Sequence, residues 1–312
     1  MQGVTAVSTA RMGREEWLAL RRKSIGGSDA AGIIGLSRWS SPYTVWADKT
    51  GRIPDKPDTE AMRIGRDLED YVARRWCEAT GKRCRRRNAI LYNRRYPFAH
   101  ADIDREVIGE DAGLECKTTS ALNVRKFRDV EFPEEYYAQC VHYLAVTGFS
   151  RWYLAVLVFG RGFYVYTLER DQAEIEALMQ AERTFWQYVK TDSPPPVDGG
   201  MPTTEAIQTI YAESSGQSIQ LFGREAALRE YQELRERRDV LEERMREIEN
   251  IVKLDMRDAE TAACGEYTIR WRNTSRKTFQ PRTLQHDHPE LDLEPYYKTT
   301  EYRTFHIIQE GN

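Results

Sequence analysis

The chain has 312 residues, of which 40% are apolar and 30% are charged, a composition typical of a globular protein. Its longest apolar run, Trp152 to Phe159, is too short to span a bilayer, and the net charge of −3 alone argues weakly against a nucleic-acid partner. Five scattered cysteines without a CxxC pair argue against a disulfide framework and favour free thiols, with a metal cluster of four of them as the weaker alternative.

Charge is distributed unevenly along the chain. Residues 1–100 carry 20 Lys and Arg against 11 Asp and Glu, whereas residues 101–200 carry 10 against 17. A basic part followed by an acidic part indicates a phosphate-binding track beside a metal-binding pocket. Ordinary surface variation would give the same pattern, and composition alone leaves both readings open.

Helical and strand patterns alternate over the first 190 residues. Helical spacing of apolar residues is found at 14–23, 28–35, 59–81, 133–148 and 171–190. Ser28 and Asp29 are the candidate N-caps of the second of these helices. Strand patterns are found at 88–93, 99–109, 113–120 and, as an aromatic hairpin, 151–169. This order predicts an α/β fold in which helices flank a mixed central β-sheet.

A proline- and glycine-rich segment, TDSPPPVDGG, indicates where the chain leaves this first domain. It contains three consecutive prolines and two glycines, as linkers commonly do. We therefore predict a domain over residues 1–192, a linker over 193–202 and a C-terminal region over 203–312.

The C-terminal region begins its regular structure with a long charged helix. Over residues 224–256, a coiled-coil-like apolar stripe is formed by Leu241, Met245, Ile248 and Val252. The segments YTIRWR and RTFHII further along predict two short strands. A helix with a small β-hairpin is the preferred interpretation, and a contact with a partner or with further copies of the chain is an alternative.

Two carboxylates and a lysine share the hairpin predicted at 99–120. Asp104 and Glu115 lie on neighbouring strands, and Lys117 shares a face with Glu115 because it is two residues away. Facing carboxylates repel each other, and a divalent cation between them would reverse the sign of that interaction. Mg²⁺ prefers such oxygen ligands, and a lysine alongside would lie near a metal-bound water or a phosphate. A solvated face with a cross-strand Glu–Lys pair is the alternative.

Polar residues on two helices and one basic stretch extend this group. Glu69 lies one turn after Gly65, and Gln139 lies one turn before Tyr143; each is either part of the site or an ordinary surface residue. The stretch 82–95 carries seven basic residues. It either follows a DNA backbone or forms a solvated edge between helix and strand.

Five blocks of the sequence, in this order, resemble the lambda exonuclease and YqaJ viral recombinase branch of the PD-(D/E)XK nucleases. The resemblance runs from about Trp17 to Tyr188, and the blocks are WLALRRKSIGGSDAAGIIGLSRWSSPYTVWADKTG, RIGRDLEDYVARRW, ADIDREV, LECKTTS and YYAQCVHYLAVTG. It implies a restriction-endonuclease-like core, and the long C-terminal region departs from the lambda pattern.

The resemblance implies a role for each residue of the predicted site. Asp104 and Glu115 are similar to the metal-binding acids, and Asp104 is preferred to Asp102 because the family acid directly precedes the pair that continues the strand. Lys117 is similar to the active-site lysine, and Glu69 to the glutamate that completes the metal site.

Further roles follow from the same resemblance. Gln139 is similar to the helix glutamine near metal and substrate, and the backbone carbonyl of Cys116 would be a further metal ligand. Ser28 is similar to the serine that binds a 5′-phosphate. The arginine that accompanies it is either Arg21 or Arg22.

The function implied is a Mg²⁺-dependent exonuclease, with Mn²⁺ as a substitute metal, that digests double-stranded DNA ends from 5′ to 3′. Family members act in recombination with a single-strand annealing protein, and a ring-shaped trimer is implied for this chain. A structure-specific endonuclease of the same fold and a non-catalytic module that binds DNA ends or an annealing protein are the alternatives. Residues 1–16 lack an apolar signal-peptide core, so we expect a cytoplasmic protein in a bacterial or phage-infected host cell, without a membrane partner.

Overall fold

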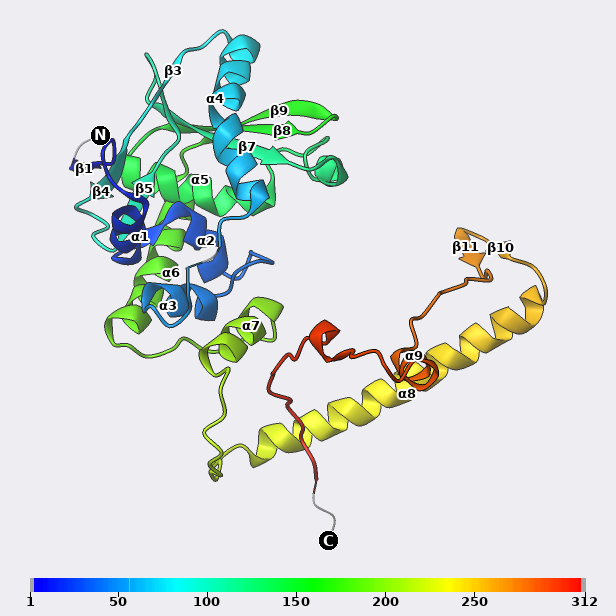
Figure 1. The fold of residues 1–312 in the computed structure, drawn as a ribbon. Helices are drawn as coiled ribbons and strands as arrows, with labels where there is room; N and C mark the ends of the chain where they lie inside the picture. The colour runs from blue at the N-terminus through cyan, green and yellow to red at the C-terminus, as the bar shows by residue number, and fades with distance from the viewer. Residues whose placement is uncertain (1–2, 56, 310–312) are drawn as a thin grey trace. The chain divides into compact units, whose positions relative to one another are not determined.

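A computed structural model describes residues 3–55 and 57–309 and divides the chain into two units, Met1–Tyr211 and Ala212–Asn312. The first unit contains two mixed β-sheets with helices packed on them, so the predicted α/β class is confirmed (Figure 1). In the part of the chain that is described, no helix is both long and apolar enough to cross a bilayer.

The larger sheet of the first unit has five strands. Its order is β3 (Cys84–Arg86), β6 (Arg105–Val107), β7 (Ala112–Thr119), β8 (Arg151–Val158) and β9 (Gly162–Glu169). Strands β7 and β8 are parallel, and all other neighbours are antiparallel. The predicted aromatic hairpin over 151–169 is the pair β8–β9.

The smaller sheet has four strands, in the order β1 (Val4–Ser8), β4 (Ala89–Asn93), β5 (Ala99–Asp102) and β2 (Ile25–Gly26). The single strand predicted over 99–109 is therefore wrong, because its first half, β5, pairs with β4 and its second half, β6, pairs with β3 and β7. Asp104 lies where the chain passes from one sheet to the other.

Two helices cover opposite faces of the five-stranded sheet. Strand residues alternate between faces, and Leu114 packs with Trp76 of α4 (Glu60–Thr80) in one apolar cluster. Residues from the other face of β8, such as Leu154, pack with Phe127 after the 3₁₀ helix η1 (Ala121–Lys126). On that face, α5 (Glu134–Thr147) runs beneath the sheet (Figure 1).

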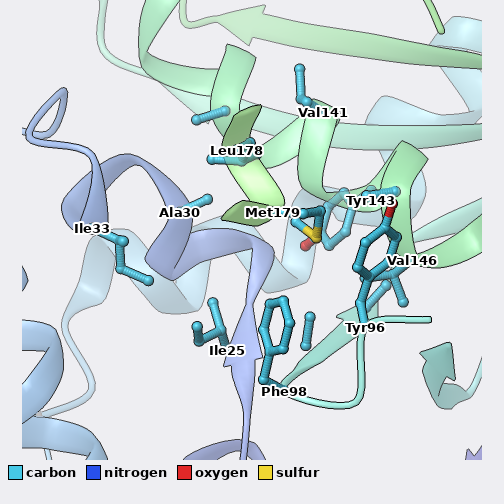
Figure 2. Close-up of a cluster of buried hydrophobic side chains, with 14 of the residues drawn as sticks. Ile25, Ala30, Ile33, Tyr96, Phe98, Val141, Tyr143, Val146, Leu178 and Met179 are labelled. Carbon is cyan, nitrogen blue, oxygen red and sulfur yellow. The ribbon is translucent and has the colours of Figure 1, made fainter. Parts of the chain in front are cut away.

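The largest core joins the N-terminal elements to the later helices. Its elements include α2 (Gly27–Ile33), α3 (Pro42–Lys49), α5, α6 (Gln172–Lys190) and α7 (Met201–Ile210), whereas α1 (Arg14–Arg22) has no buried residue. Figure 2 shows Ile25 and Ala30 gathered with Tyr143 of α5 and Met179 of α6. Each buried aliphatic side chain contributes about 1.5–3 kcal/mol. This core fixes the start of α2 against α5, which matters for the site.

The boundary between the units differs from the predicted linker at 193–202. Helix α7 begins within the predicted linker, at Met201, and packs in the first unit: Ala206 belongs to the main core, and the Thr203 hydroxyl lies 2.7 Å from the Ser41 hydroxyl. The chain divides only after Tyr211. The proline- and glycine-rich composition correctly indicated an irregular segment. It did not indicate that the following helix, α7, packs on the first unit through residues distant in sequence.

The second unit contains α8 (Glu225–Met256), the hairpin β10 (Thr261–Cys264) with β11 (Tyr267–Arg270), α9 (Pro281–Asp287) and the short helix η2 (Glu294–Tyr296). The long helix and the hairpin were predicted, but the hairpin partner was wrong. RTFHII forms no strand over 303–308, and its Phe305 and Ile308 are exposed, since no sheet face covers them.

Candidate active site

Strand β7 and helix α5 bring three polar side chains together below the sheet. Glu115 and Lys117 share a face of β7, and the Lys117 ammonium lies 2.6 Å from Glu115 Oε1. The Gln139 amide of α5 donates to the same oxygen at 2.7 Å. Glu115 is only 3% exposed, so its charge depends on these two donors.

Asp104 joins this group from the junction between the sheets. Its Oδ2 accepts a hydrogen bond from the backbone N–H of Cys116 at 2.8 Å, which places its carboxylate beside the start of the Glu115–Lys117 segment. Burial, together with the charges of Glu115 and Glu69, raises the pKa of Asp104 well above its ordinary value. Burial also raises the pKa of Glu115, against the opposing effect of Lys117.

Lys117 remains charged in this setting. Burial alone would lower the pKa of Lys117, but the adjacent carboxylates of Glu115 and Asp104 outweigh it, and the net shift is upward. Its ammonium also lies 5.4 Å from the centre of the Tyr136 ring. Among the described residues, the Lys117 ammonium thus lies beside the carboxylates of the buried Glu115 and the half-buried Asp104, so one positive charge faces two negative charges.

A divalent cation fits this deficit. Glu115 Oε2 is buried and has no hydrogen-bond partner among the described residues, a costly state for a carboxylate oxygen. Carboxylate and backbone carbonyl oxygens are suitable ligands for Mg²⁺. The Cys116 side chain points to the opposite face, where it packs with Cys77 and Cys84, so only the backbone of Cys116 can contribute at the acid pair.

Glu69, predicted as a further metal ligand, is turned toward two arginines. Its Oε1 lies 2.5 Å from Arg105 and 3.4 Å from Arg86. In the described part of the chain, no three His, Cys, Asp or Glu side chains converge as a ready metal-holding group. The structure therefore shows an acid pair with Glu69 nearby, and Glu69 would have to leave Arg105 to complete a ligand set.

The two aspartates of the ADID segment have separate environments. Asp102 Oδ2 accepts a hydrogen bond from the Trp17 indole at 2.9 Å, and its backbone carbonyl accepts one from the Tyr143 hydroxyl at 3.1 Å. Asp102 therefore supports α1 and α5, whereas Asp104 faces Glu115. The two aspartates therefore have different hydrogen-bond partners.

The two candidate phosphate-binding arginines also separate. The Arg21 guanidinium donates to the Ser28 hydroxyl at 2.8 Å. Arg22 turns instead to Asp55 and, at 3.8 Å, to Asp48. Ser28 is not the N-cap, as α2 begins at Gly27 and Asp29 bonds back to the Gly26 N–H, so the hydroxyl of Ser28 remains available to Arg21.

Asp29 and Lys49, which the sequence did not assign to the site, support the position of Arg21. Lys49 lies 2.6 Å from Asp29 and donates to the backbone carbonyl of Arg21 at 3.1 Å. Burial opposes ionisation of Asp29, but Lys49 and Arg21 outweigh it and lower the pKa of Asp29 to about 2. No signal in the sequence marked this pair, since the helix that carries Lys49 was not predicted.

Tyr143 connects the Arg21–Ser28 pair to the acid pair. Its hydroxyl accepts from the Gln139 amide at 2.9 Å, and its ring covers Gly27, where an added Cβ would come within 2.6 Å of the ring. Gln139 and Tyr143 are four residues apart on α5 and therefore share a face of the helix. That spacing was visible in the sequence and would have identified Tyr143 as a neighbour of the predicted site.

Gly27→Ala is expected to destabilise the first unit by about 1–3 kcal/mol, because the new methyl group must displace the buried Tyr143 ring. Urea unfolding measures the change. Gly13→Ala is the control, since an added Cβ at Gly13 meets nothing within 4 Å. Equal stability of the two variants would contradict a close contact between Gly27 and Tyr143.

The basic stretch 82–95 is largely paired with acids. Arg85 and Arg87 both contact Glu106, and Arg86 lies 3.0 Å from Asp70. Lys82 contacts Glu110, and Arg95 contacts Glu176 at 3.3 Å. These ion pairs offset the acidic strands, which supports the interpretation as a charged edge more than a free DNA track.

Comparisons with known proteins identify a family and agree with the fold. Residues 16–150 match the model of the YqaJ-like viral recombinase domain. The chain is 38% identical over 304 residues to the uncharacterized protein YqaJ of Bacillus subtilis (strain 168), covering 96% of this chain and 95% of that protein.

Two solved structures of LHK-Exo, an alkaline exonuclease from Laribacter hongkongensis, are also similar. The complex with dAMP has a TM-score of 0.50 at 19% identity, and the second structure has 0.48 at 18%. Each comparison covers 57% of this chain and 93% of LHK-Exo. At this identity the likeness to the dAMP complex shows a shared fold.

Proposed function

This chain belongs to the YqaJ-like viral recombinase family, and from that membership and the pair of Asp104 and Glu115 we propose that it is a Mg²⁺-dependent exonuclease. The proposed substrate is a double-stranded DNA end, digested from 5′ to 3′ in recombination by single-strand annealing. The observation that carries the proposal is the group of Asp104, Glu115 and Lys117, in which the buried Glu115 Oε2 has no hydrogen-bond partner among the residues that the structure describes.

Each residue of this group has a chemical role that follows from its position. Asp104 and Glu115 would hold the metal, with the Cys116 carbonyl and, after release from Arg105, Glu69. When bound, a divalent cation supplies an activated water and stabilises the leaving 3′-oxygen.

The residues around the acid pair would position the reactants. The Lys117 ammonium can hydrogen-bond the nucleophile or offset negative charge on the phosphate, since it is held at the edge of the acid pair by Glu115. Gln139 fixes the orientation of the Glu115 carboxylate. Arg21 and Ser28 would bind a terminal 5′-phosphate, a contact that sets the polarity of digestion.

Removal of divalent metal with EDTA is expected to abolish digestion of linear duplex DNA, and Mg²⁺ or Mn²⁺ should restore it. Because Mg²⁺ bound between Asp104 and Glu115 would offset their repulsion only in the folded state, it should also raise the melting temperature. That rise should be lost in Glu115→Gln, measured without DNA. Full activity in EDTA, or an equal rise in the variant, would exclude this metal site.

Two alternatives are tested with the same protein. A structure-specific endonuclease would cut covalently closed circular DNA, which an exonuclease that requires a free end leaves intact. A non-catalytic binding module would retain DNA binding but show no metal-dependent cleavage of any substrate. The charged group of Glu115 and Lys117 favours a catalytic role over simple binding, because DNA binding alone gives no reason to bury it.

A further inference from the structure

Helix α8 has an unusual degree of exposure for its length. It has 32 residues, about 48 Å at 1.5 Å per residue, and only Met256 at its end is buried. Among its exposed apolar residues, Leu234, Leu241, Met245 and Ile248 are 49% to 64% accessible. A long helix gains most of its stability from packing an apolar face, and the described residues of the second unit leave this face uncovered.

The apolar residues of α8 follow the spacing of a coiled coil. Alternating steps of four and three residues give the positions 227, 231, 234, 238, 241, 245, 248 and 252. All are apolar or aromatic except Arg238, which occupies one a position. The stripe predicted over 241–252 is therefore the end of a seam that runs nearly the whole length of the helix.

The charged residues that flank this seam identify its partner. In a parallel coiled coil, each g residue faces the e residue five positions later in the other helix. In α8 these pairs are Glu230 with 235, Arg237 with 242 and Arg244 with 249, where 235 is Arg and 242 and 249 are Glu. All three pairs are of opposite charge when the partner is a second, parallel copy of α8.

An antiparallel arrangement does not have this complementarity. In an antiparallel pair, g residues of one helix lie beside g residues of the other. When the two helices overlap over their full length, Arg237 of one helix would lie beside Arg244 of the other. The charge pattern therefore distinguishes the two orientations. A single polar residue in the seam, Arg238, would favour one register, and two guanidinium groups can reach solvent from a two-stranded seam more easily than three.

We propose that α8 is a self-association helix, which pairs with α8 of a second copy of this chain as a parallel, in-register, two-stranded coiled coil. The inference rests on residues of the second unit alone and does not depend on the proposed nuclease function. The sequence-based expectation of a trimer came from resemblance over the first domain, whereas this contact lies in the region where the resemblance ends.

The test uses the full-length protein and two charge-reversed variants. In the variant Arg237→Glu/Arg244→Glu, the new acidic g residues face the acidic e residues of the second helix and repel them. In the variant Glu242→Arg/Glu249→Arg, the new basic e residues face the basic g residues of the second helix and repel them. Light scattering after size exclusion should give a dimer for the unchanged chain and half that mass for each variant alone. An equimolar mixture of the two variants should return to the dimer mass, because every reversed g residue then meets an oppositely charged e residue.

Orientation is measured by cysteine cross-linking in a Cys264→Ser background, since Cys264 is exposed. Leu234→Cys, at a core d position, should form an intermolecular disulfide rapidly, and Glu236→Cys, on the outer face, should not. A monomer at micromolar concentration, or a mass unchanged by both charge reversals, would overturn the proposal. A cross-link at 236 instead of 234 would overturn the seam.

Discussion

Lys117→Ala is expected to lower Mg²⁺-dependent digestion of linear duplex DNA by about 10²–10³-fold, the usual effect of removing one preorganised electrostatic group. The reason is positional, since the Lys117 ammonium contacts Glu115 Oε1 and its charge offsets the carboxylates of both Glu115 and Asp104. Single-turnover cleavage of a 5′-phosphorylated duplex measures the effect. Affinity for DNA, measured in Ca²⁺ or EDTA, should change by less than tenfold.

Lys126→Ala is the matched control, because Lys126 lies on η1 and pairs with Glu135 at 2.8 Å outside the acid pair. Its cleavage rate should remain within a few-fold of the unchanged chain. Circular dichroism of both variants verifies that the fold is retained. Undiminished cleavage by Lys117→Ala would remove this lysine from the mechanism, and equal losses in both variants would point to a general effect of surface charge.

Arg21→Ala is expected to reduce the preference for 5′-phosphorylated over 5′-hydroxyl ends by about 10–100-fold, as one charge-assisted contact contributes about 1.5–3 kcal/mol. Arg21 donates to Ser28 and is held by Lys49 through its carbonyl, so the guanidinium is positioned before DNA binds. The measurement compares the initial rates on the two duplexes, which differ only in the terminal phosphate.

Arg22→Ala serves as the control for this prediction. Its guanidinium is occupied by Asp55 and Asp48, so its loss should leave the ratio of the two rates nearly unchanged. The ratio is the informative quantity, because a general loss of stability lowers both rates together. A reduced ratio in Arg22→Ala but not in Arg21→Ala would reverse the assignment.

Local pattern was sufficient to predict the strand that carries Glu115 and Lys117 and the helix that carries Gln139. Alternation along 113–120 placed Glu115 and Lys117 on one face, and helical spacing over 133–148 placed Gln139 and Tyr143 on one side of α5. Both patterns depend only on residues close in sequence. The order of the blocks then indicated which of many polar residues belong to one site.

The features that local sequence patterns did not predict depend on contacts between residues that are far apart in the chain. The strand predicted over 99–109 divides because its halves find partners in different sheets, and no local signal reports that choice. The same holds for Glu69, whose carboxylate is drawn to Arg105. RTFHII has strand propensity but no sheet edge to join, and propensity alone does not create structure.

The alternation of side chains along strand β7 limits where homologues can gain or lose residues. Glu115 and Lys117 face α5, while Leu114 and Cys116 face the core beneath α4. Insertion or loss of one residue between Gly113 and Lys117 would exchange the two sets, placing charges in the apolar layer and a leucine or a cysteine beside the acid pair. A residue added in the turn at 109–111 would leave this alternation unchanged, because it lies before the strand. We therefore expect homologues to differ in length at that turn and to keep an identical residue count along the strand.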